Sequence, residues 1–213
     1  FIIQYSPMKK AMNRPNQEAN RNQEIEIRAL LNDEQRSTLE AKLSDRGAEL
    51  EERMYIVDMY LCPVAVQSFQ EIEMQKVGSF SLRIREQTAN GQTKVEVNTK
   101  IITNEGDHNS WEEHETEVSS FDEAVAIFQA IGFKSFFTLE KERVTYQVDD
   151  MTVCLEDIVD FGPVIEVEVM ANKSKSQQAK QRIRAFLTDI GVTDEQIVAK
   201  SVTNMLMRER AQF

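Results

Sequence analysis

Apolar and polar residues alternate along most of this chain, which is the period of a β-strand with two different faces. The stretch from Glu24 to Arg28 is a strict example. Asn-Gly at 90–91 is a strong hairpin signal between two such runs, and Asp-Asp at 149–150 marks a second turn. The pattern predicts eight strands, at 24–28, 53–61, 80–87, 93–103, 111–118, 138–148, 151–158 and 165–170.

Three other segments repeat apolar residues every three or four positions, as amphipathic helices do. We expect them at 33–47, 120–132 and 174–191, each after a capping residue and each closed by a glycine. Their expected packing residues are Leu39, Leu43 and Leu50; Ala124, Ile127, Phe128 and Ile131; and Ile183, Phe186, Leu187 and Ile190. Residues 64–78 fit either a loop or a short helix. The tail from Thr193 is expected to pack back onto the body.

The polar faces of these strands carry charges of both signs. They include Glu24, Glu26 and Arg28; Arg83 and Arg85; Lys94, Glu96, Asn98 and Lys100; Glu113, Glu115 and Glu117; Lys141 and Arg143, or Glu140 and Glu142; and Glu166 and Glu168. If the helices cover the aliphatic faces, the charged faces would line a closed barrel, and about eight strands suffice to hold one small ligand. A charged strand face is usually solvated, however, and periodicity alone leaves open an interaction scaffold without a tunnel.

Composition narrows the function classes. The 213 residues are 41% apolar and 29% charged, which is ordinary for a soluble globular protein, and no stretch approaches the length of a membrane span. The net charge of −11 disfavours nucleic acid and anionic membranes as partners. Two cysteines make neither a disulfide framework nor a metal-binding pair, so we expect a reducing, cytoplasmic setting.

The chain is expected to form a flexible arm at 1–22 and a single domain at 23–213. Residues 8–22 are polar, and the apolar start is too short for a signal peptide. Residues 1–7 fit an upstream extension or an expression remnant, since Met8 could be a start. Among the conspicuous single residues, His108 and His114 are expected in solvent, and Cys154 on the apolar face of its strand.

Short charged motifs follow one another in order between Glu24 and Leu206. They are Glu24-Ile-Glu26-Ile-Arg28, Asp58-Met-Tyr60, Leu82 to Arg85, Lys100, Glu115-Thr-Glu117, Phe-Thr-Leu-Glu-Lys141-Glu-Arg143, and a last stretch with Leu155-Glu156, Gly162 and Glu166-Val-Glu168. Each is weak alone. Together they resemble the CYTH superfamily of triphosphate tunnel metalloenzymes, and most closely its class IV adenylyl cyclase branch.

The resemblance implies an α+β fold: a closed eight-stranded antiparallel β-barrel, with a charged interior, flanked by amphipathic helices. It implies an enzyme that acts on a nucleoside or organic triphosphate with Mg²⁺ or Mn²⁺. The best-fitting label is an adenylyl cyclase, which converts ATP to cyclic AMP and pyrophosphate. A triphosphatase acting on tripolyphosphate, thiamine triphosphate or a nucleoside triphosphate, and a non-catalytic binding module, are the alternatives. Dimers are common in the family, so a homodimer is within this expectation.

The resemblance also suggests site residues. Metal ligands would come from Glu24, Glu26, Glu156, Glu166 and Glu168, although Glu168 fits an outer-shell role or a basic partner nearly as well. Phosphate contacts would come from Arg28, Arg83, Arg85, Lys100, Lys141 and Arg143. Catalytic roles would fall to Glu24, Glu26, Arg28 and Lys141.

Three positions depart from the family pattern. Arg28 stands where lysine is usual, which keeps the charge but replaces a point ammonium with a planar fork. Glu156 replaces an aspartate and moves its carboxylate outward by one methylene. An arginine often found around Trp111 to Glu115 is missing. These departures bear on the reaction more than on the fold, and they motivate the binding-module alternative.

Overall fold

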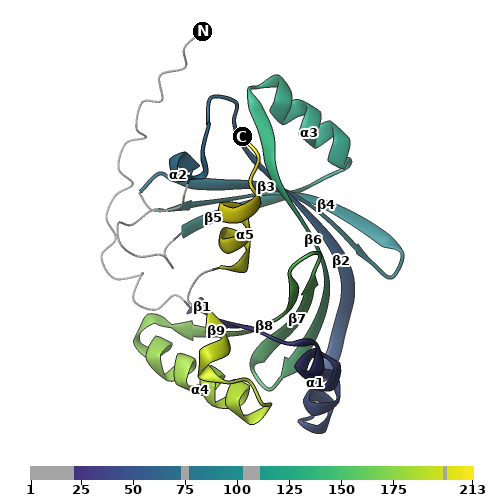
Figure 1. The fold of residues 1–213 in the computed structure, drawn as a ribbon, viewed down its shortest axis with the longest axis vertical. Helices are drawn as coiled ribbons and strands as arrows, with labels where there is room; N and C mark the ends of the chain where they lie inside the picture. The colour runs from purple at the N-terminus through teal and green to yellow at the C-terminus, as the bar shows by residue number, and fades with distance from the viewer. Residues whose placement is uncertain (1–21, 73–76, 103–110, 199–200) are drawn as a thin grey trace.

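A computed structural model describes residues 22–72, 77–102, 111–198 and 201–213. Its strands form one curved antiparallel sheet (Figure 1) with the order β5-β4-β3-β2-β6-β7-β8-β1-β9. The strands are β1 (Asn22–Leu30), β2 (Glu49–Pro63), β3 (Phe80–Ala89), β4 (Gln92–Ile102), β5 (Trp111–Val118), β6 (Phe133–Val148), β7 (Met151–Ile158), β8 (Gly162–Asn172) and β9 (Ile197–Val198). The α+β class is therefore confirmed, and all eight predicted strands are present.

The sheet has nine strands where eight were predicted, and the strand pairings of the described residues do not close it into the predicted barrel. It ends at β5 on one side and β9 on the other without a pairing between them. The short β9 pairs only with Arg28 and Ala29. A strand of two residues, such as β9, is too short to be detected from alternation. Closure of a sheet depends on pairing between segments far apart in sequence. The result is a curved sheet with a concave face.

The two longest strands join two similarly built halves. β2 and β6 pair from Glu49 opposite Gln147 to Pro63 opposite Phe133, whereas β3 and β7 each pair with only part of that length. Apart from the short α2 (Phe69–Ile72) between β2 and β3, the order strand, helix and three strands occurs twice, with α1 (Asp33–Asp45) after β1 and α3 (Phe121–Ala130) after β5. The concave face is thus lined by both halves, which meet at β2 and β6.

Helices cover the convex face. Ile25 of β1 and Ile165 of β8 belong to one apolar cluster with Ile183 of α4 (Ser176–Asp189), and Leu39 of α1 joins it. Below α3, Leu82 and Ile84 belong to another. Burying these aliphatic groups under helices is the main favourable term in folding. The aliphatic strand faces therefore point outward beneath helices, which leaves the charged faces on the concave side.

Some predicted packing residues lie elsewhere. Leu50 belongs to β2 and is 53% exposed, because α1 ends at Asp45. Ile127 and Ile131 are 59% and 65% exposed, because the ten-residue α3 packs through the side that carries Ala124. Two other short or terminal helices are α2 (Phe69–Ile72) and α5 (Val202–Arg210). None of the helices in the described ranges has the length and apolar composition that crossing a bilayer requires.

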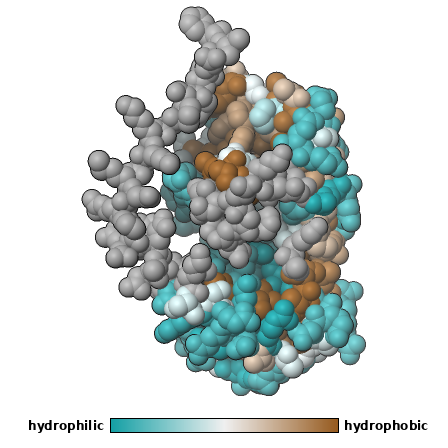
Figure 2. Space-filling view, turned by 90° about the vertical axis from the view of Figure 1, so that its left-hand side faces the viewer, coloured by the Kyte–Doolittle hydropathy of each residue, from teal (hydrophilic) through white to brown (hydrophobic). Residues whose placement is uncertain are grey.

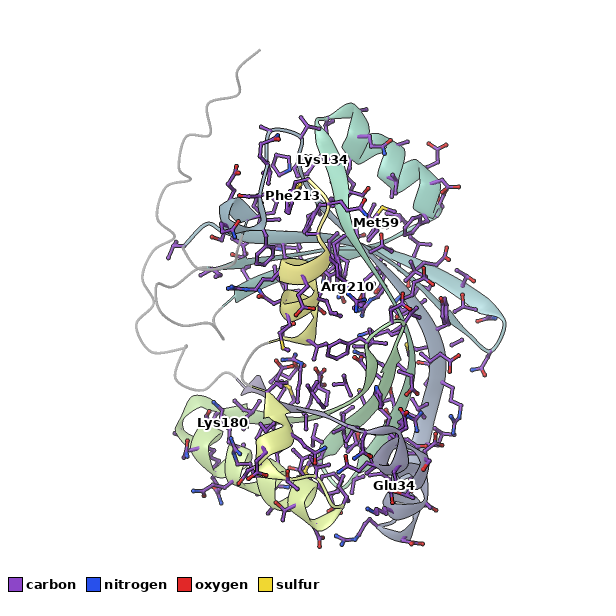
Figure 3. All side chains as sticks on the ribbon, in the orientation of Figure 1. Glu34, Met59, Lys134, Lys180, Arg210 and Phe213 are labelled. Atoms are coloured by element: carbon purple, nitrogen blue, oxygen red, sulfur yellow. The ribbon has the colours of Figure 1, made fainter. Side chains whose placement is uncertain are left out.

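The C-terminal segment packs back onto the body, and it does so on the concave side (Figure 1). Leu206 of α5 is 1% exposed and joins a cluster with Tyr60, Phe137 and Val164. Beyond α5, the chain follows β6: the Gln212 amide donates to the Phe136 carbonyl at 2.8 Å. The Phe213 ring stacks on Phe136 and lies under the Lys134 ammonium (Figure 3). α5 thus covers an apolar part of the concave face.

We expect Ile183→Ala to lower the free energy of unfolding by about 2–5 kcal/mol, because it removes a fully buried side chain between α4 and the sheet. Ile127→Ala makes the same chemical change on the exposed side of α3 and should cost about 0.5 kcal/mol or less. Urea unfolding of both variants measures the difference. Equal losses would contradict the assignment of the convex face to the core.

Candidate functional site

Strand register places the charged residues on one face. Glu26 lies opposite Glu168 and Arg28 opposite Glu166 across β1 and β8, and residues opposite one another in an antiparallel pair share a face. The most buried charged residues are Asp58 at 1%, Glu156 at 5%, Lys141 at 6% and Glu166 at 8% exposure. This burial excludes the solvated-face alternative for the middle of the sheet. Figure 2 shows hydrophilic residues around the hollow in the lower half of the molecule, with some hydrophobic residues beside them.

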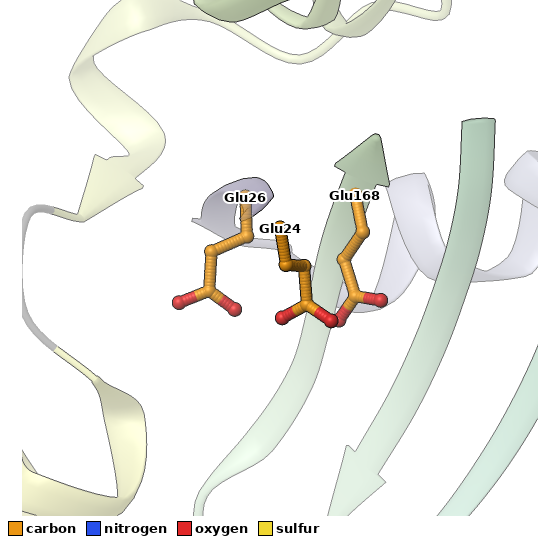
Figure 4. A group of neighbouring side chains, drawn as sticks. All are labelled: Glu24, Glu26 and Glu168. Carbon is orange, nitrogen blue, oxygen red and sulfur yellow. The ribbon is translucent and has the colours of Figure 1, made fainter. Parts of the chain in front are cut away.

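Three glutamates converge at the β1–β8 edge of this face (Figure 4). One carboxylate oxygen from each of Glu24, Glu26 and Glu168 lies within 4.8 Å of the others. Burial raises the pKa of Glu26 even though the neighbouring Arg28 acts to lower it. Oxygen donors crowded in this way suit Mg²⁺ or Mn²⁺, which neutralise the mutual repulsion of the carboxylates. The donor set therefore fits the implied metal, and we call these three residues the acidic triad.

Glu166 and Glu168 form one acid pair next to the triad. Burial acts to raise the pKa of Glu166. The charge of Arg28 and a hydrogen bond with Glu168 outweigh this effect, so the pKa is lowered. Burial also raises the pKa of Glu168, and the Glu166 carboxylate raises it further. Because two neighbouring carboxylates resist a double negative charge, the proton of the pair is favoured on Glu168, which donates a hydrogen bond to the Glu166 carboxylate.

Two of the predicted metal ligands are bound to cations. Glu156 Oε1 accepts from Lys141 Nζ at 2.6 Å and from Arg143 Nε at 2.6 Å. Glu166 accepts from Arg28, which also donates to Glu26. The structure therefore brings Glu24, Glu26 and Glu168 together and places Glu156 and Glu166 with basic partners. Glu168 lies in the group of carboxylates, where sequence reasoning left its role open.

A further buried carboxylate escaped sequence reasoning. Asp58 Oδ1 and Oδ2 accept from Arg85 Nε and Nη2 at 2.6 and 2.7 Å, and Arg83 Nε lies 3.5 Å from Oδ1. The signal was present, because Asp58 belongs to a recognised motif and shares the alternation of its strand. Without knowing that β2 lies beside β3, however, the sequence did not pair Asp58 with the arginines.

The last predicted phosphate ligand, Lys100, sits toward the β5 edge of the same face. Its side chain is 36% exposed, and Nζ lies 3.3 Å from Glu113 Oε2. Glu113 also accepts from Asn98 Nδ2 at 2.5 Å. Lys100 thus belongs to the rim of the concave face. It lies outside a less exposed group of cations, Arg28, Arg83, Arg85, Lys141 and Arg143, which we call the cation cluster.

Cys154 lies on the charged face, and its predicted place on the apolar face is wrong. It is opposite Glu166 on β8 and opposite Thr145 on β6, and its Sγ lies 3.9 Å from Thr145 Oγ1. Burial raises the pKa of the Cys154 thiol to about 11, although Arg143 acts to lower it. His114 is exposed, with Nε2 3.0 Å from Glu112, as expected for a solvent residue. His108 lies outside the described residues, as does the predicted arm up to residue 21.

Comparisons with known proteins agree with this arrangement. A family model described as the CYTH domain matches residues 22–202. Among curated proteins, none matches the chain. Solved structures do match, and their identities below 25% show a shared fold.

Three of these structures illustrate the likeness. The PH1819 protein of Pyrococcus horikoshii OT3 has a TM-score of 0.70 at 23% identity, covering 88% of this chain and 99% of its own. A candidate adenylate cyclase of Vibrio parahaemolyticus has a TM-score of 0.64 at 16% identity, covering 86% and 97%. HpAC1 of Hippeastrum, a candidate adenylyl cyclase with a dominant triphosphatase activity, has a TM-score of 0.61 at 16% identity, covering 88% and 95%.

The sheet with its two halves, the face of opposite charges and the match over most of the sequence lead to one assignment. This chain belongs to the CYTH family, whose members are metal-dependent enzymes that act on triphosphates.

Proposed function

We propose that this protein is a divalent-metal-dependent triphosphatase, which releases orthophosphate from the end of a triphosphate chain. The observation that carries the proposal is the concave face, where the acidic triad lies beside the cation cluster. A triphosphate carries about four negative charges and needs concentrated positive charge around it. A face with cations alone would bind the anion, but it would lack the oxygen ligands for a metal.

The acidic triad is the proposed metal site. A bound Mg²⁺ or Mn²⁺ would supply positive charge at the phosphate oxygens and lower the pKa of bound water. The cation cluster nearby would repel a metal ion. The carboxylates of Glu24 and Glu26 offset this repulsion at the triad and would attract the metal. Arg28 binds Glu26 and Glu166 together, and it thereby fixes the triad next to the phosphate ligands.

The cation cluster is the proposed phosphate site. Arginine can hold two phosphate oxygens with its fork, and lysine binds as a compact charge. Fixed cations stabilise the charge that gathers on phosphate oxygens in the transition state, which is the main catalytic contribution in phosphoryl transfer. Burial lowers the pKa of Lys141 against the opposing effect of Glu156, so Lys141 is the cation here best able to exchange a proton. Lys100 would meet the outer end of the substrate.

Hydrolysis is favoured over cyclisation by the position of α5. A cyclase must also hold a ribose and a base, so that the 3′-hydroxyl attacks the α-phosphate. Among the described residues, Phe137, Leu139 and Ile158 supply apolar surface on the concave face, and they pack in one cluster with α5. In hydrolysis, a water oxygen instead attacks the terminal phosphorus, the bond to the bridging oxygen breaks, and the remaining chain leaves. The dominant triphosphatase activity of HpAC1 supports this choice.

Adenylyl cyclase activity is the second candidate. It is favoured by the order of motifs from Glu24 to Glu168 and by the likeness to candidate adenylate cyclases. The same metal and phosphate ligands serve both reactions, and the placement of the α-phosphate or the terminal phosphate decides between them. The products therefore separate the two candidates.

We expect purified protein with Mg²⁺ or Mn²⁺ to release orthophosphate from tripolyphosphate, and at least one organic triphosphate to compete with it. The Glu24→Gln, Glu26→Gln variant should lose about 100-fold or more of this rate, because two triad carboxylates lose their charge. Product chromatography measures the outcome.

Glu49→Gln, Glu51→Gln is the matched control, because it changes the same Glu-x-Glu spacing at two exposed positions of β2. It should keep the wild-type rate. Cyclic AMP and pyrophosphate as the main products from ATP would replace the first candidate with the second. Full activity of the Glu24→Gln, Glu26→Gln variant would refute the metal assignment.

Metal affinity should rise with pH up to about pH 9, because the pKa of Glu168 is raised to about 9. The pKa of Glu168 is raised in the folded protein by burial and by Glu166, so a metal ligand at this position must first lose its proton. Raising the pH removes that competition, and the affinity increases until Glu168 is ionised. Calorimetric titration with Mn²⁺ in two buffers of different ionisation enthalpy counts the protons released.

Glu168→Gln supplies the control for this measurement, because its amide can still donate to Glu166 but has no proton to lose to the metal. This variant should bind Mn²⁺ more weakly and with less pH dependence. Proton release as large as that of the wild type would show that the titrating ligand is another group.

A further inference from the structure

Asp58 stands at the centre of the sheet without a part in the proposed function. Its strand, β2, runs between β3 and β6, and Asp58 lies opposite Arg85 and Leu139. Its neighbours on the same face of β2, Ile56 and Tyr60, are 0% and 7% exposed. This part of the face therefore accepts apolar and aromatic side chains. A charged residue that is 1% exposed is not required there to fill space.

The bond between Asp58 and Arg85 fixes a direction. Arg85 Nε and Nη2 donate to separate oxygens of Asp58 at 2.6 and 2.7 Å, so one edge of the guanidinium group is bound twice. Two parallel bonds prevent the planar group from turning. Arginine has five N–H donors, and three of them remain on the side away from Asp58. Asp58 thus determines where the remaining donors of Arg85 point.

Arg83 is attracted to the same carboxylate without being satisfied by it. Its Nε lies 3.5 Å from Asp58 Oδ1. Among the side-chain nitrogens and oxygens of the described residues, Arg83 Nε is the one buried atom without a hydrogen-bond partner. A buried donor without an acceptor costs free energy. An anionic ligand that brings oxygen atoms to this position would remove that cost.

Asp58 keeps its negative charge although it is buried. Burial acts to raise the pKa of Asp58. The hydrogen bond from Arg85 and the charges of Arg83 and Lys141 outweigh this effect, so the pKa is lowered. An isolated pair of buried charges is seldom better for stability than apolar side chains of similar size. Stability alone is therefore a poor explanation for a buried Asp58. A role in orienting arginines accounts for its contacts with both Arg85 and Arg83.

We infer that Asp58 is a positioning residue that aims Arg85 and Arg83 at the phosphates of the substrate. The inference rests on the proposed function, because it names what holds two of its phosphate ligands in place. Asp58 itself would touch neither the substrate nor the metal. Its loss should therefore weaken substrate binding more than it slows the bound substrate.

Asp58→Asn tests this with tripolyphosphate and Mg²⁺. The amide keeps the shape of the side chain but removes its charge and one of its two acceptors. We expect KM to rise about 10- to 100-fold and kcat to change by about threefold or less, because a displaced guanidinium loses contact with the substrate. Asp58→Glu keeps the charge and shifts the carboxylate by one methylene, so it should raise KM while the fold retains its buried ion pairs.

Asp157→Asn is the matched control. Asp157 accepts from Arg36 Nε through both oxygens at 3.1 and 2.9 Å, and it is 40% exposed on the convex side of β7. The change therefore breaks the same kind of pair away from the concave face. It should leave KM and kcat at wild-type values even if thermal stability falls.

A double-mutant cycle with Arg85→Gln separates orientation from a general loss of structure. If Asp58 acts through Arg85 and Arg83, Asp58→Asn should raise KM less when Arg85 is already glutamine than it does in the wild type, because only the part that acts through Arg83 is left. A full additional effect would overturn the inference, as would a wild-type KM for Asp58→Asn. Should Asp58→Asn fail to fold, a wild-type KM for Asp58→Glu would overturn it equally.

Failure of the proposed function gives a different result. In that case the wild-type protein neither hydrolyses tripolyphosphate with Mg²⁺ nor binds it by calorimetry, and the inference falls with it. Activity in the wild type with an unchanged KM for Asp58→Asn, or for Asp58→Glu should Asp58→Asn fail to fold, removes the inference alone. The wild-type protein therefore tests the proposed function, and the Asp58 variants test the inference, in the same experiment.

Discussion

The structure depends on compensating charges that the sheet removes from water. Moving a carboxylate or an ammonium group into a protein interior costs several kcal/mol unless hydrogen-bonded partners replace the lost water. On the concave face, each of the most buried carboxylates has such a partner: Asp58 binds Arg85, Glu156 binds Lys141 and Arg143, and Glu166 binds Arg28. The helices on the convex face supply the apolar burial that makes this arrangement affordable.

This compensation gives carboxylates two different tasks. Asp58, Glu156 and Glu166 hold cations in place, whereas Glu24, Glu26 and Glu168 crowd together as oxygen donors. Arg28 connects the two groups, because it donates to Glu26 and to Glu166 at once. A lysine at this position would offer a single ammonium in place of a fork. The departure from the family pattern at Arg28 is thus consistent with the carboxylates that surround it.

Much of the fold could be predicted from the sequence, and the reasons for success and failure are physical. Alternation located the eight longer strands because each has one apolar face, as at Ile25 and Ile165. It missed β9, since two residues show no period. It also assigned Leu50 to the packing face of a helix, because the spacing of apolar residues does not show where α1 ends. The described residues show no pairing that closes the barrel, and alternation could not test closure because the partners of an edge strand lie far away in sequence.

The site was less accessible to sequence reasoning than the strands. The family resemblance pointed to Glu24 and Glu168, but the sequence could not show that β1 and β8 bring them together. Cys154 was a different kind of error: it has the same parity as Glu156, yet the apolar character of cysteine suggested the core. Asp58 required the strand order itself, because Arg85 is 27 residues away and only the pairing of β2 with β3 makes them neighbours.

The position of α5 links the fold to the choice of substrate. The concave face has a charged part and an apolar part, and Leu206 packs on the latter together with Phe137 and Val164. A ligand bound through its phosphates would gain its affinity from the arginines and lysine of the charged part, such as Arg83, Arg85 and Lys141, which are held by buried carboxylates. A ligand that also needs apolar contacts must find them outside this packed region. Among the described residues, recognition would therefore depend on the phosphate chain more than on the group attached to it.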